Sequence, residues 1–294
     1  MAARVLLIGA DGQLGADIAA VLSADPRYEV TALTHDRIEV CRKDSVADAV
    51  RTFKPDVVVN TAAFHQLDRC EEEPERAFAV NAAALKGICD VCAGAGAALV
   101  HFSTDYVFGG EKRSPYRETD PAWPVNVYGA SKLAGEAVVR AGAKKYYILR
   151  VSGLYGKAGP RGKGLNFPDL MVKLAREKGE LRVVDDQVLT PTSTLSVARR
   201  LADLFDRVPF GSYHFSDEGA CSWFEFAREI LAITRIPARL TAVKTGFFGE
   251  KTRRPPYTVL SKEKIRAFMP LFPSWKESLA EYLGAPPTTS SGAP

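Results

Sequence analysis

The sequence predicts an α/β fold in which a doubly wound parallel sheet carries a smaller, mixed α/β lobe. Apolar runs rich in Val, Ile and Leu recur through the first half of the chain and are too short for typical helices; they lie at 4–9, 28–33, 56–60, 98–103 and 146–151. Helical patterns lie between these runs, near 14–22, 44–53, 74–94 and 128–141. Such alternation places helices on both faces of a parallel sheet, whose ligands bind beyond the carboxyl ends of the strands.

The second half of the chain is less regular and predicts the smaller lobe. Helices are expected near 165–178, 193–206, 222–233 and 274–283, with short strands near 181–185 and 211–215. We therefore divide the chain into a first domain at 1–155, a second lobe at 156–283 and a disordered tail at 284–294, which has no apolar period. The pattern leaves open a return of later segments to the sheet of the first domain.

Composition narrows the class of protein. The 294 residues are 46% hydrophobic and 25% charged, which is sufficient for a large buried core. The formal charge of +4 is spread without a long basic run, so no nucleic-acid partner is expected. Five scattered cysteines argue for a reducing compartment and against a disulfide framework. No apolar stretch reaches membrane-spanning length, so we expect a cytoplasmic protein with no membrane partner.

A CxxC pair, Cys89 and Cys92, falls within the predicted helix at 74–94. Zinc would require two more soft ligands, and none of the four histidines has a companion at metal-binding spacing, so no metal is predicted. A redox dithiol is the alternative. We favour two thiols that pack inside the fold.

A glycine loop joins the first strand to the first helix. Gly9, Gly12 and Gly15 follow the strand and precede a helical segment, where free backbone N–H groups would bind a pyrophosphate. The GxxGxxG spacing differs from the usual GxGxxG fingerprint, which leaves open a loop that only turns. Its position in a strand–loop–helix unit favours dinucleotide binding and a Rossmann-like domain.

The second strand indicates which dinucleotide binds. A carboxylate at its end would bind the adenosine ribose, but the strand ends in Thr34 and His35, with Glu39 further on. Arg37 or Arg42 would meet a 2′-phosphate. We therefore expect NADPH as the cofactor, with NADH also accepted.

Candidate catalytic residues follow the fourth strand. It ends in STDYVF, which places Ser103, Thr104 and Tyr106 at the carboxyl edge of the sheet. Tyr128 and Lys132 share one face of the next helix. A tyrosine donates a proton to a carbonyl oxygen while the cofactor supplies hydride. We expect the lysine cation to lower the tyrosine pKa, and Thr104 to align the substrate oxygen.

An ordered set of motifs resembles the dTDP-4-dehydrorhamnose reductases, a branch of the extended short-chain dehydrogenase/reductases. The motifs are GxxGQLG, NTAAF, STDYVFGG, YRETDP, NVYGASKLAGE, DDQVLTPT and RPPYTVL, and the likeness covers roughly residues 4–283. The resemblance implies a Rossmann domain plus a substrate-binding lobe. It also implies NAD(P)H-dependent reduction of the C4 ketone of a nucleotide-linked deoxysugar, dTDP-4-dehydro-L-rhamnose, in the supply of dTDP-rhamnose for cell-wall polysaccharide.

The resemblance also implies site residues. The catalytic positions are Thr104, Tyr128 and Lys132. The cofactor positions are Gly9, Asp11, Gly12, Gln13, Leu14, Gly15, Arg37, Glu39, Ala62, Ala63, Tyr128 and Lys132. Tyr106, Asn166 and Arg254 fall where the family meets substrate, and an arginine fork suits a diphosphate. A nucleotide sugar is then the expected partner, and a homodimer stays open.

Two positions depart from the family pattern. The family usually reads R-T-S-W after the fifth strand, whereas this chain ends that motif in Gly153, which removes a large apolar wall. The pocket is then wider, or refilled by Phe64, Leu154 or Tyr155. The family also commonly has Asp where this chain has Gly109, a minor loop change.

Two other functions share these motifs. Nucleotide-sugar dehydratases carry Thr-Asp-Glu after the fourth strand, whereas this chain has Tyr106 in place of the glutamate, which disfavours elimination; epimerases share the glycine loop and YxxxK. The regulatory β-subunit of methionine adenosyltransferase keeps the same motifs and also lacks the tryptophan, so turnover must distinguish it.

Several residues also have a purely structural interpretation. Tyr106 would pack, and Arg253 and Arg254 would form a solvated pair. We assign structural roles to three histidines and one tryptophan, namely His65, His101, His214 and Trp223, the last in the core of the second lobe.

Overall fold

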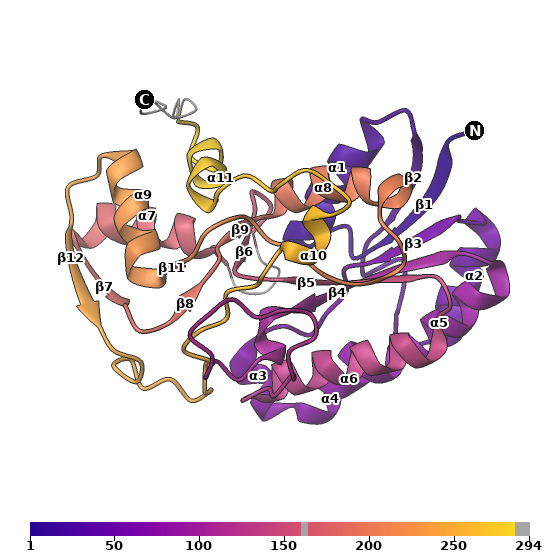
Figure 1. The fold of residues 1–294 in the computed structure, drawn as a ribbon, viewed down its shortest axis with the longest axis horizontal. Helices are drawn as coiled ribbons and strands as arrows, with labels where there is room; N and C mark the ends of the chain where they lie inside the picture. The colour runs from indigo at the N-terminus through magenta and orange to yellow at the C-terminus, as the bar shows by residue number, and fades with distance from the viewer. Residues whose placement is uncertain (160–163, 286–294) are drawn as a thin grey trace.

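A six-stranded parallel sheet forms the centre of the computed structural model, which describes residues 1–159 and 164–285 (Figure 1). Its strands are β1 (Ala3–Ile8), β2 (Tyr28–Leu33), β3 (Val57–Asn60), β4 (Ala98–Thr104), β5 (Tyr146–Val151) and β10 (Gly211–His214). They lie in the order β10-β5-β4-β3-β1-β2, and every neighbouring pair is parallel. The predicted fold class is confirmed.

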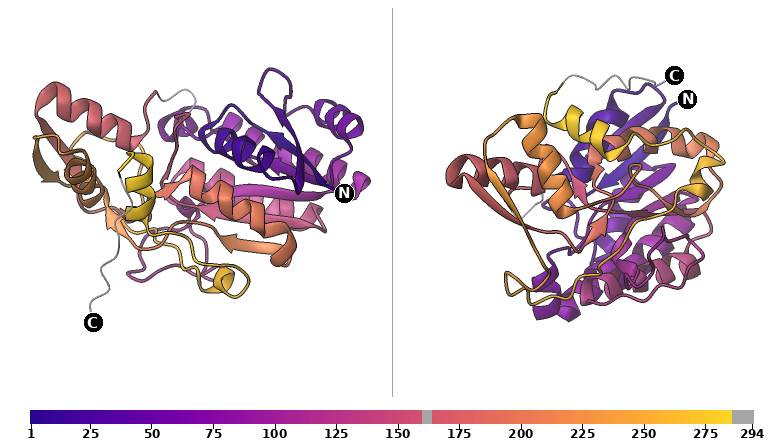
Figure 2. Two further views of the ribbon diagram at one scale, coloured as in Figure 1. Left: turned by 90° about the horizontal axis from the view of Figure 1, so that it is seen from above. Right: turned by 60° about the vertical axis from the view of Figure 1, so that its left-hand side comes forward.

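Helices cover both faces of this sheet. Those on one face are α1 (Gln13–Ser23) and α8 (Thr194–Arg207); those on the other are α2 (Lys43–Phe53), α5 (Ala84–Ala95) and α6 (Val127–Gly142) (Figures 1 and 2). Alternate residues of each strand point to opposite faces. Val5 and Leu7 therefore pack with α1 and α8, whereas Leu6 and Ile8 pack with α2 and α5. Burial on both faces explains the continuous apolar runs.

The predicted helix at 74–94 consists of three pieces. It begins as α4 (Pro74–Phe78), widens into a π-helical turn at Ala79–Ala83 (η1) and continues as α5; a short helix, α3 (Leu67–Glu72), precedes it. Apolar periodicity does not encode such a turn, and π turns frequently occur at functional sites. The turn carries Asn81, whose side chain is described below.

The same run, Pro74–Ala95, is the one described helical stretch that is long and apolar enough to cross a membrane. Its residues Leu85 and Ile88 are buried against the sheet, as expected of a core helix. Cys89 and Cys92 pack there too, and burial raises their thiol pKa values to about 11 and about 12. Both thiols therefore stay protonated at neutral pH and pack as predicted.

The smaller lobe surrounds its own core. It contains α7 (Phe167–Lys178), α9 (Trp223–Thr234), α11 (Trp275–Tyr282) and the parallel pair β7 (Glu180–Val184) and β12 (Arg239–Val243). Two-residue strands pair as β6 (Leu154–Tyr155) with β9 (Thr192–Ser193), and β8 (Val188–Leu189) with β11 (Cys221–Ser222). Phe226 and Trp275 are buried in this core, and Trp223 packs against it.

The chain passes between the two lobes more than once. It enters the smaller lobe near residue 155, but α8 packs on α1 and β10 pairs with β5 in the large sheet. The segment 211–215 therefore belongs to the first sheet, not to the second lobe. The short helix α10 (Glu263–Arg266) also packs there through Ile265. Gly284 and Ala285 still donate N–H bonds to α11 carbonyls, and the predicted disorder of 286–294 lies outside the described residues.

Candidate active site

The carboxyl edge of the sheet has one topological switch point, between β1 and β3. The chain leaves β1 toward β2 on one side and returns to β3 on the other. Ligands of open α/β sheets bind at such points, because the loops diverge and leave a crevice. The loop at 9–15 follows β1, and the loop that begins at Thr61 follows β3. The two predicted cofactor loops therefore flank the expected crevice.

The glycine loop brings backbone segments into close contact with one another. Gly9 has φ +85°, and a Cβ there would lie 2.6 Å from Thr61 Oγ1. A Cβ on Gly15 would collide with the carbonyl of Gly9, so the loop and α1 pack backbone to backbone. Gly12 is the N-cap of α1, and no side chain caps this helix. The N–H groups of its first turn therefore suit an anion such as a dinucleotide diphosphate.

The loop after β3 is held from both ends. Thr61 Oγ1 donates to the carbonyls of Ile8 (2.8 Å) and Gly9 (3.0 Å). Asn81 accepts the N–H of Phe64 (2.9 Å) and donates to its carbonyl (2.8 Å). Ala62 and Ala63 lie between these anchors and form a small-residue wall. Neither anchor was predicted from the sequence, although Thr61 lies within the NTAAF motif.

The end of β2 leaves basic groups in solvent. Arg37 and Arg42 are exposed, and neither guanidinium has a hydrogen bond or ion pair within 1–159 and 164–285. Glu39 instead accepts the N–H of Cys41 (3.0 Å) next to α2. Asp11 is exposed in the glycine loop. This arrangement suits a phosphate better than a free ribose hydroxyl.

Tight packing places the end of β4 next to the start of α6. Asn126 caps α6 by accepting the N–H of Gly129 (2.8 Å), and a Cβ on Gly129 would collide with the Tyr106 carbonyl. The rings of Tyr106 and Tyr128 consequently lie 6.1 Å apart, edge to face. The Thr104 hydroxyl lies close enough to the Tyr128 phenol to affect its pKa. The structure thus brings together the predicted catalytic hydroxyls.

Tyr128 differs electrostatically from the expectation. Burial raises the pKa of its phenol above the ordinary value, and the neighbouring Thr104 hydroxyl lowers that pKa by less. The net shift is upward, and the lowering expected from Lys132 stays a prediction. Burial wins because a phenolate here would lose its solvation. Tyr128 is therefore a protonated acid at neutral pH.

Lys132 is 2% exposed and lies on the same face of α6 as Tyr128. Burial lowers the pKa of its ammonium to about 8, against the opposing charge of Glu136. Its Nζ lies 3.3 Å from His101 Nε2. The lysine is thus close to losing its proton within the physiological range.

Asp105 fixes the hydroxyl of Thr104. Thr104 Oγ1 donates to Asp105 Oδ1 (3.1 Å) and accepts the N–H of Tyr106 (3.2 Å). Asp105 Oδ2 accepts from Ser152 Oγ (2.8 Å), and burial raises the pKa of its carboxyl to about 6. This role of Asp105 was not predicted from the sequence, where the residue entered only through the comparison with dehydratases.

The predicted substrate residues fall into two groups. Arg254 shifts the pKa of Tyr106, so the two lie near one another, and Arg254 Nε is buried without a partner in the described chain. Asn166 instead caps α7 by accepting the N–H of Asp169 (3.1 Å). Its amide donates to the Gly156 carbonyl and to Tyr282 Oη, both at 2.8 Å. Both donors of Asn166 are therefore used inside the protein, and a substrate contact there stays a prediction.

Comparison with known proteins identifies the family. Residues 3–286 match the family model described as the RmlD substrate binding domain. The Escherichia coli dTDP-4-dehydrorhamnose reductase is 34% identical over 305 residues, covering 98% of this chain and 99% of that protein. The chain belongs to the dTDP-4-dehydrorhamnose reductase family.

Other relatives agree with this membership. The Bacillus subtilis spore coat polysaccharide biosynthesis protein SpsK is 41% identical over 280 residues, covering 95% of this chain and 96% of that protein. The Bacillus anthracis dTDP-4-dehydrorhamnose reductase in complex with NADP superposes with a TM-score of 0.91 at 34% identity, covering 96% and 99% of the two chains. A Thermotoga maritima UDP-glucose 4-epimerase, with a TM-score of 0.82 at 16% identity over 96% and 97% of the chains, shows a shared fold alone.

Gly153 differs from the family tryptophan for a steric reason. Its φ is +51°, and a Cβ would lie 2.6 Å from Leu189 Cδ1 and 3.3 Å from Pro191 Cα. Leu189 thus occupies the space beside it. Tyr155 does not refill the sugar pocket, because it is 1% exposed and packs with Phe226 in the core of the smaller lobe.

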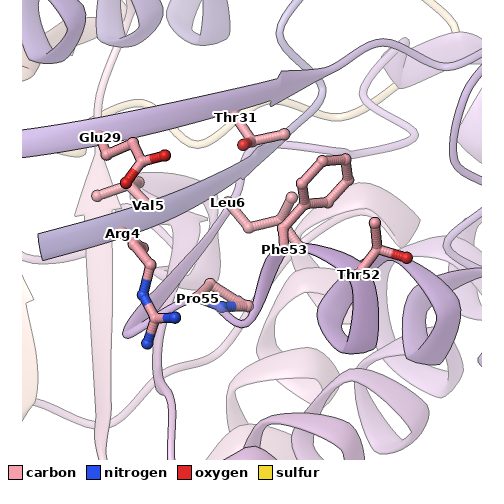
Figure 3. A pocket seen from close by; sticks show the side chains of 8 residues that line it. All are labelled: Arg4, Val5, Leu6, Glu29, Thr31, Thr52, Phe53 and Pro55. Carbon is pink, nitrogen blue, oxygen red and sulfur yellow. The ribbon is translucent and has the colours of Figure 1, made fainter.

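A cavity of about 180 Å³ lies away from this site (Figure 3). Arg4, Glu29, Thr31 and Phe53 are among its lining residues, near the amino ends of β1 and β2. Ligands of parallel sheets bind at the opposite edge. We therefore assign this cavity no role in the chemistry of the family.

Gly153→Ala should lower the free energy of unfolding by about 1–3 kcal/mol, because it adds both positive-φ strain and a contact with Leu189. Gly179→Ala is the matched control, since Gly179 has φ +66° and no atom within 4 Å of its virtual Cβ. Urea unfolding of both variants should give the larger loss for Gly153→Ala. Equal losses would show that the Leu189 contact has no energetic weight.

Proposed function

We propose that this protein is an NADPH-dependent reductase that converts dTDP-4-dehydro-L-rhamnose to dTDP-L-rhamnose. The observation that carries the proposal is the assembly of Thr104, Tyr128 and Lys132 at the carboxyl edge of the sheet, the same edge from which the glycine loop leaves β1. Membership of a family whose named relatives are reductases supports the same activity.

Tyr128 is the proton donor. The bound cofactor supplies hydride to the C4 carbon. Negative charge then develops on the C4 oxygen, and Tyr128 Oη gives it a proton. Because burial keeps the phenol protonated, the donor is ready before substrate arrives. Thr104 holds the C4 oxygen in line once its hydroxyl proton turns from Asp105 to that oxygen.

The cofactor is held in four places. The expected diphosphate contacts are the backbone of Gly12 through Gly15, at the uncapped start of α1. Ala62 and Ala63 form the wall beside it, and Lys132 binds the nicotinamide ribose. Arg37, with Arg42, meets the 2′-phosphate of NADPH. NADH is expected to bind less tightly, because it lacks that phosphate.

The substrate diphosphate is expected at Arg254. Its buried Nε lacks a partner in the described residues, and unpaired buried donors are costly. A diphosphate oxygen would supply the missing acceptor. Tyr106 lies near Arg254, and its ring is 6.1 Å from that of the catalytic tyrosine.

Two alternatives are less well supported. Water elimination is disfavoured because Tyr106 stands where dehydratases carry a glutamate, and because Asp105 is hydrogen-bonded to Ser152 and Thr104. The interpretation as a regulatory subunit requires the same motifs without turnover, whereas the full-length relatives are named as reductases. We further expect a cytoplasmic enzyme, with a homodimer left open, that supplies rhamnose for surface polysaccharide, as the name of the SpsK relative suggests.

The deciding experiment follows NADPH absorbance while a 4,6-dehydratase and a 3,5-epimerase make the keto-sugar in situ from dTDP-glucose. Consumption that requires the epimerase establishes the proposed substrate. Consumption without the epimerase points to a different keto-sugar. Bound NADPH with no consumption would leave the regulatory interpretation.

Tyr128→Phe should lower kcat by about 10²–10⁴-fold, because it removes the proton donor. The NADPH dissociation constant should stay within twofold of wild type, which fluorescence titration would measure. Tyr146→Phe is the control, since Tyr146 is the first residue of β5 and lies at the amino ends of the strands, opposite the site. A near-normal rate in Tyr128→Phe would refute its role as the acid.

Arg37→Ala should raise the KM for NADPH about tenfold and leave the KM for NADH unchanged, because only NADPH carries the 2′-phosphate. Arg51→Ala, an exposed arginine of α2 paired with Asp48, is the control. Initial rates with each cofactor test the difference. An equal change with both cofactors would place Arg37 outside the phosphate site.

A further inference from the structure

His101 is the one described group that hydrogen-bonds the Lys132 ammonium. It lies in β4, three residues before Thr104, and is 1% exposed. Its Nε2 is 3.3 Å from Lys132 Nζ. From the sequence, His101 was predicted to be structural only, because a lone histidine in a strand gives no signal of a partner on a later helix.

Hydrogen-bond chemistry fixes the state of this histidine. A lysine ammonium only donates, so Nε2 must accept and the ring proton must sit on Nδ1. Burial and the positive charge of Lys132 both lower the pKa of His101, which keeps the ring neutral. Nδ1 itself is buried and has no partner in the described residues. Nothing else in the described chain therefore competes with Lys132 in choosing the tautomer.

The other charged groups around Lys132 do not take the same bond. Glu136 lies one turn further along α6, but its carboxylate accepts from Ser103 Oγ (2.6 Å), Arg150 (2.8 Å) and Arg140 (2.7 Å). Tyr128 lies one turn before Lys132 and keeps its proton. His101 is thus the neutral group that accepts a hydrogen bond from Lys132, whereas the Glu136 carboxylate is engaged by other donors.

We propose that His101 is a positioning residue that holds one N–H of Lys132 and directs the other two toward Tyr128 and the cofactor ribose. This inference rests on the proposed reductase function. An ammonium has three N–H donors, so one hydrogen bond to His101 in β4 orients the group and leaves two N–H donors available. His101 also stabilises the charged form of the lysine, because an ammonium N–H donates a stronger hydrogen bond than a neutral amine N–H.

Removal of the His101 acceptor should change the pKa of Lys132 in one direction. The lysine pKa is already lowered to about 8 by burial. Loss of the bond from His101 would disfavour the ammonium further, so its pKa would fall again. The reductive rate, which needs the ammonium, would then decline at a lower pH than in wild type.

His101→Leu tests this by its pH profile. We expect kcat to fall about tenfold and the alkaline limb of the kcat profile to move to lower pH by about one unit. His101→Gln, which keeps an acceptor, should restore much of both. Val100→Ala is the stability control, since Val100 faces the opposite side of the sheet and should leave the limb in place. An unshifted limb in His101→Leu would overturn the proposal.

A second measurement does not depend on turnover. Nitrogen-15 NMR of the histidine rings in the protein alone should show His101 neutral with its proton on Nδ1, and Lys132→Met should change that pattern. A proton on Nε2 in wild type would refute the proposed bond. If the protein lacks reductase activity, the proposed function fails, and the NMR result still decides whether His101 holds Lys132.

Discussion

A buried ion pair between Glu136 and Arg150 fixes the catalytic helix to the sheet. Glu136 is fully buried and Arg150 is 3% exposed, and two hydrogen bonds of 2.8 Å join them. A buried pair is weak evidence for net stability, but loss of one partner typically costs about 3–5 kcal/mol. Glu136 lies one turn beyond Lys132, so the pair sets the rotation of α6. Ser103, the neighbour of Thr104, joins the same carboxylate. The two catalytic elements therefore share one anchor.

The cofactor wall is tied to the same helix. Asn81, in the π-helical turn, donates to Ser131 Oγ (3.0 Å) on α6 and also clamps the Phe64 backbone. Thr61 ties the other end of that loop to the glycine loop. A series of hydrogen bonds thus connects the glycine loop to Ser131, the residue before Lys132. Such supporting contacts hold catalytic geometry more tightly than loops alone would.

Local sequence patterns predicted the fold and the catalytic residues. They could not predict which residues far apart in the sequence contact one another. Buried parallel strands are continuous apolar runs, and the four-residue spacing of Tyr128 and Lys132 is helical, so both could be predicted from the sequence. The bond between His101 and Lys132 joins residues 31 positions apart. The return of β10 to the first sheet left no local signal either. Asn166 is different, because Asn followed by Asp169 at the third helical position is a recognisable cap signal.

Burial determines the protonation states of the groups in the site. It raises the pKa of Tyr128 and of Asp105, and it lowers that of Lys132, so each group is biased toward its neutral form. A site that resists a buried phenolate keeps its proton until a partner with developing negative charge is present. A ketone oxygen that receives hydride is such a partner, since its charge forms only in the transition state. Reduction therefore uses the same desolvation that prevents Tyr128 from ionising alone.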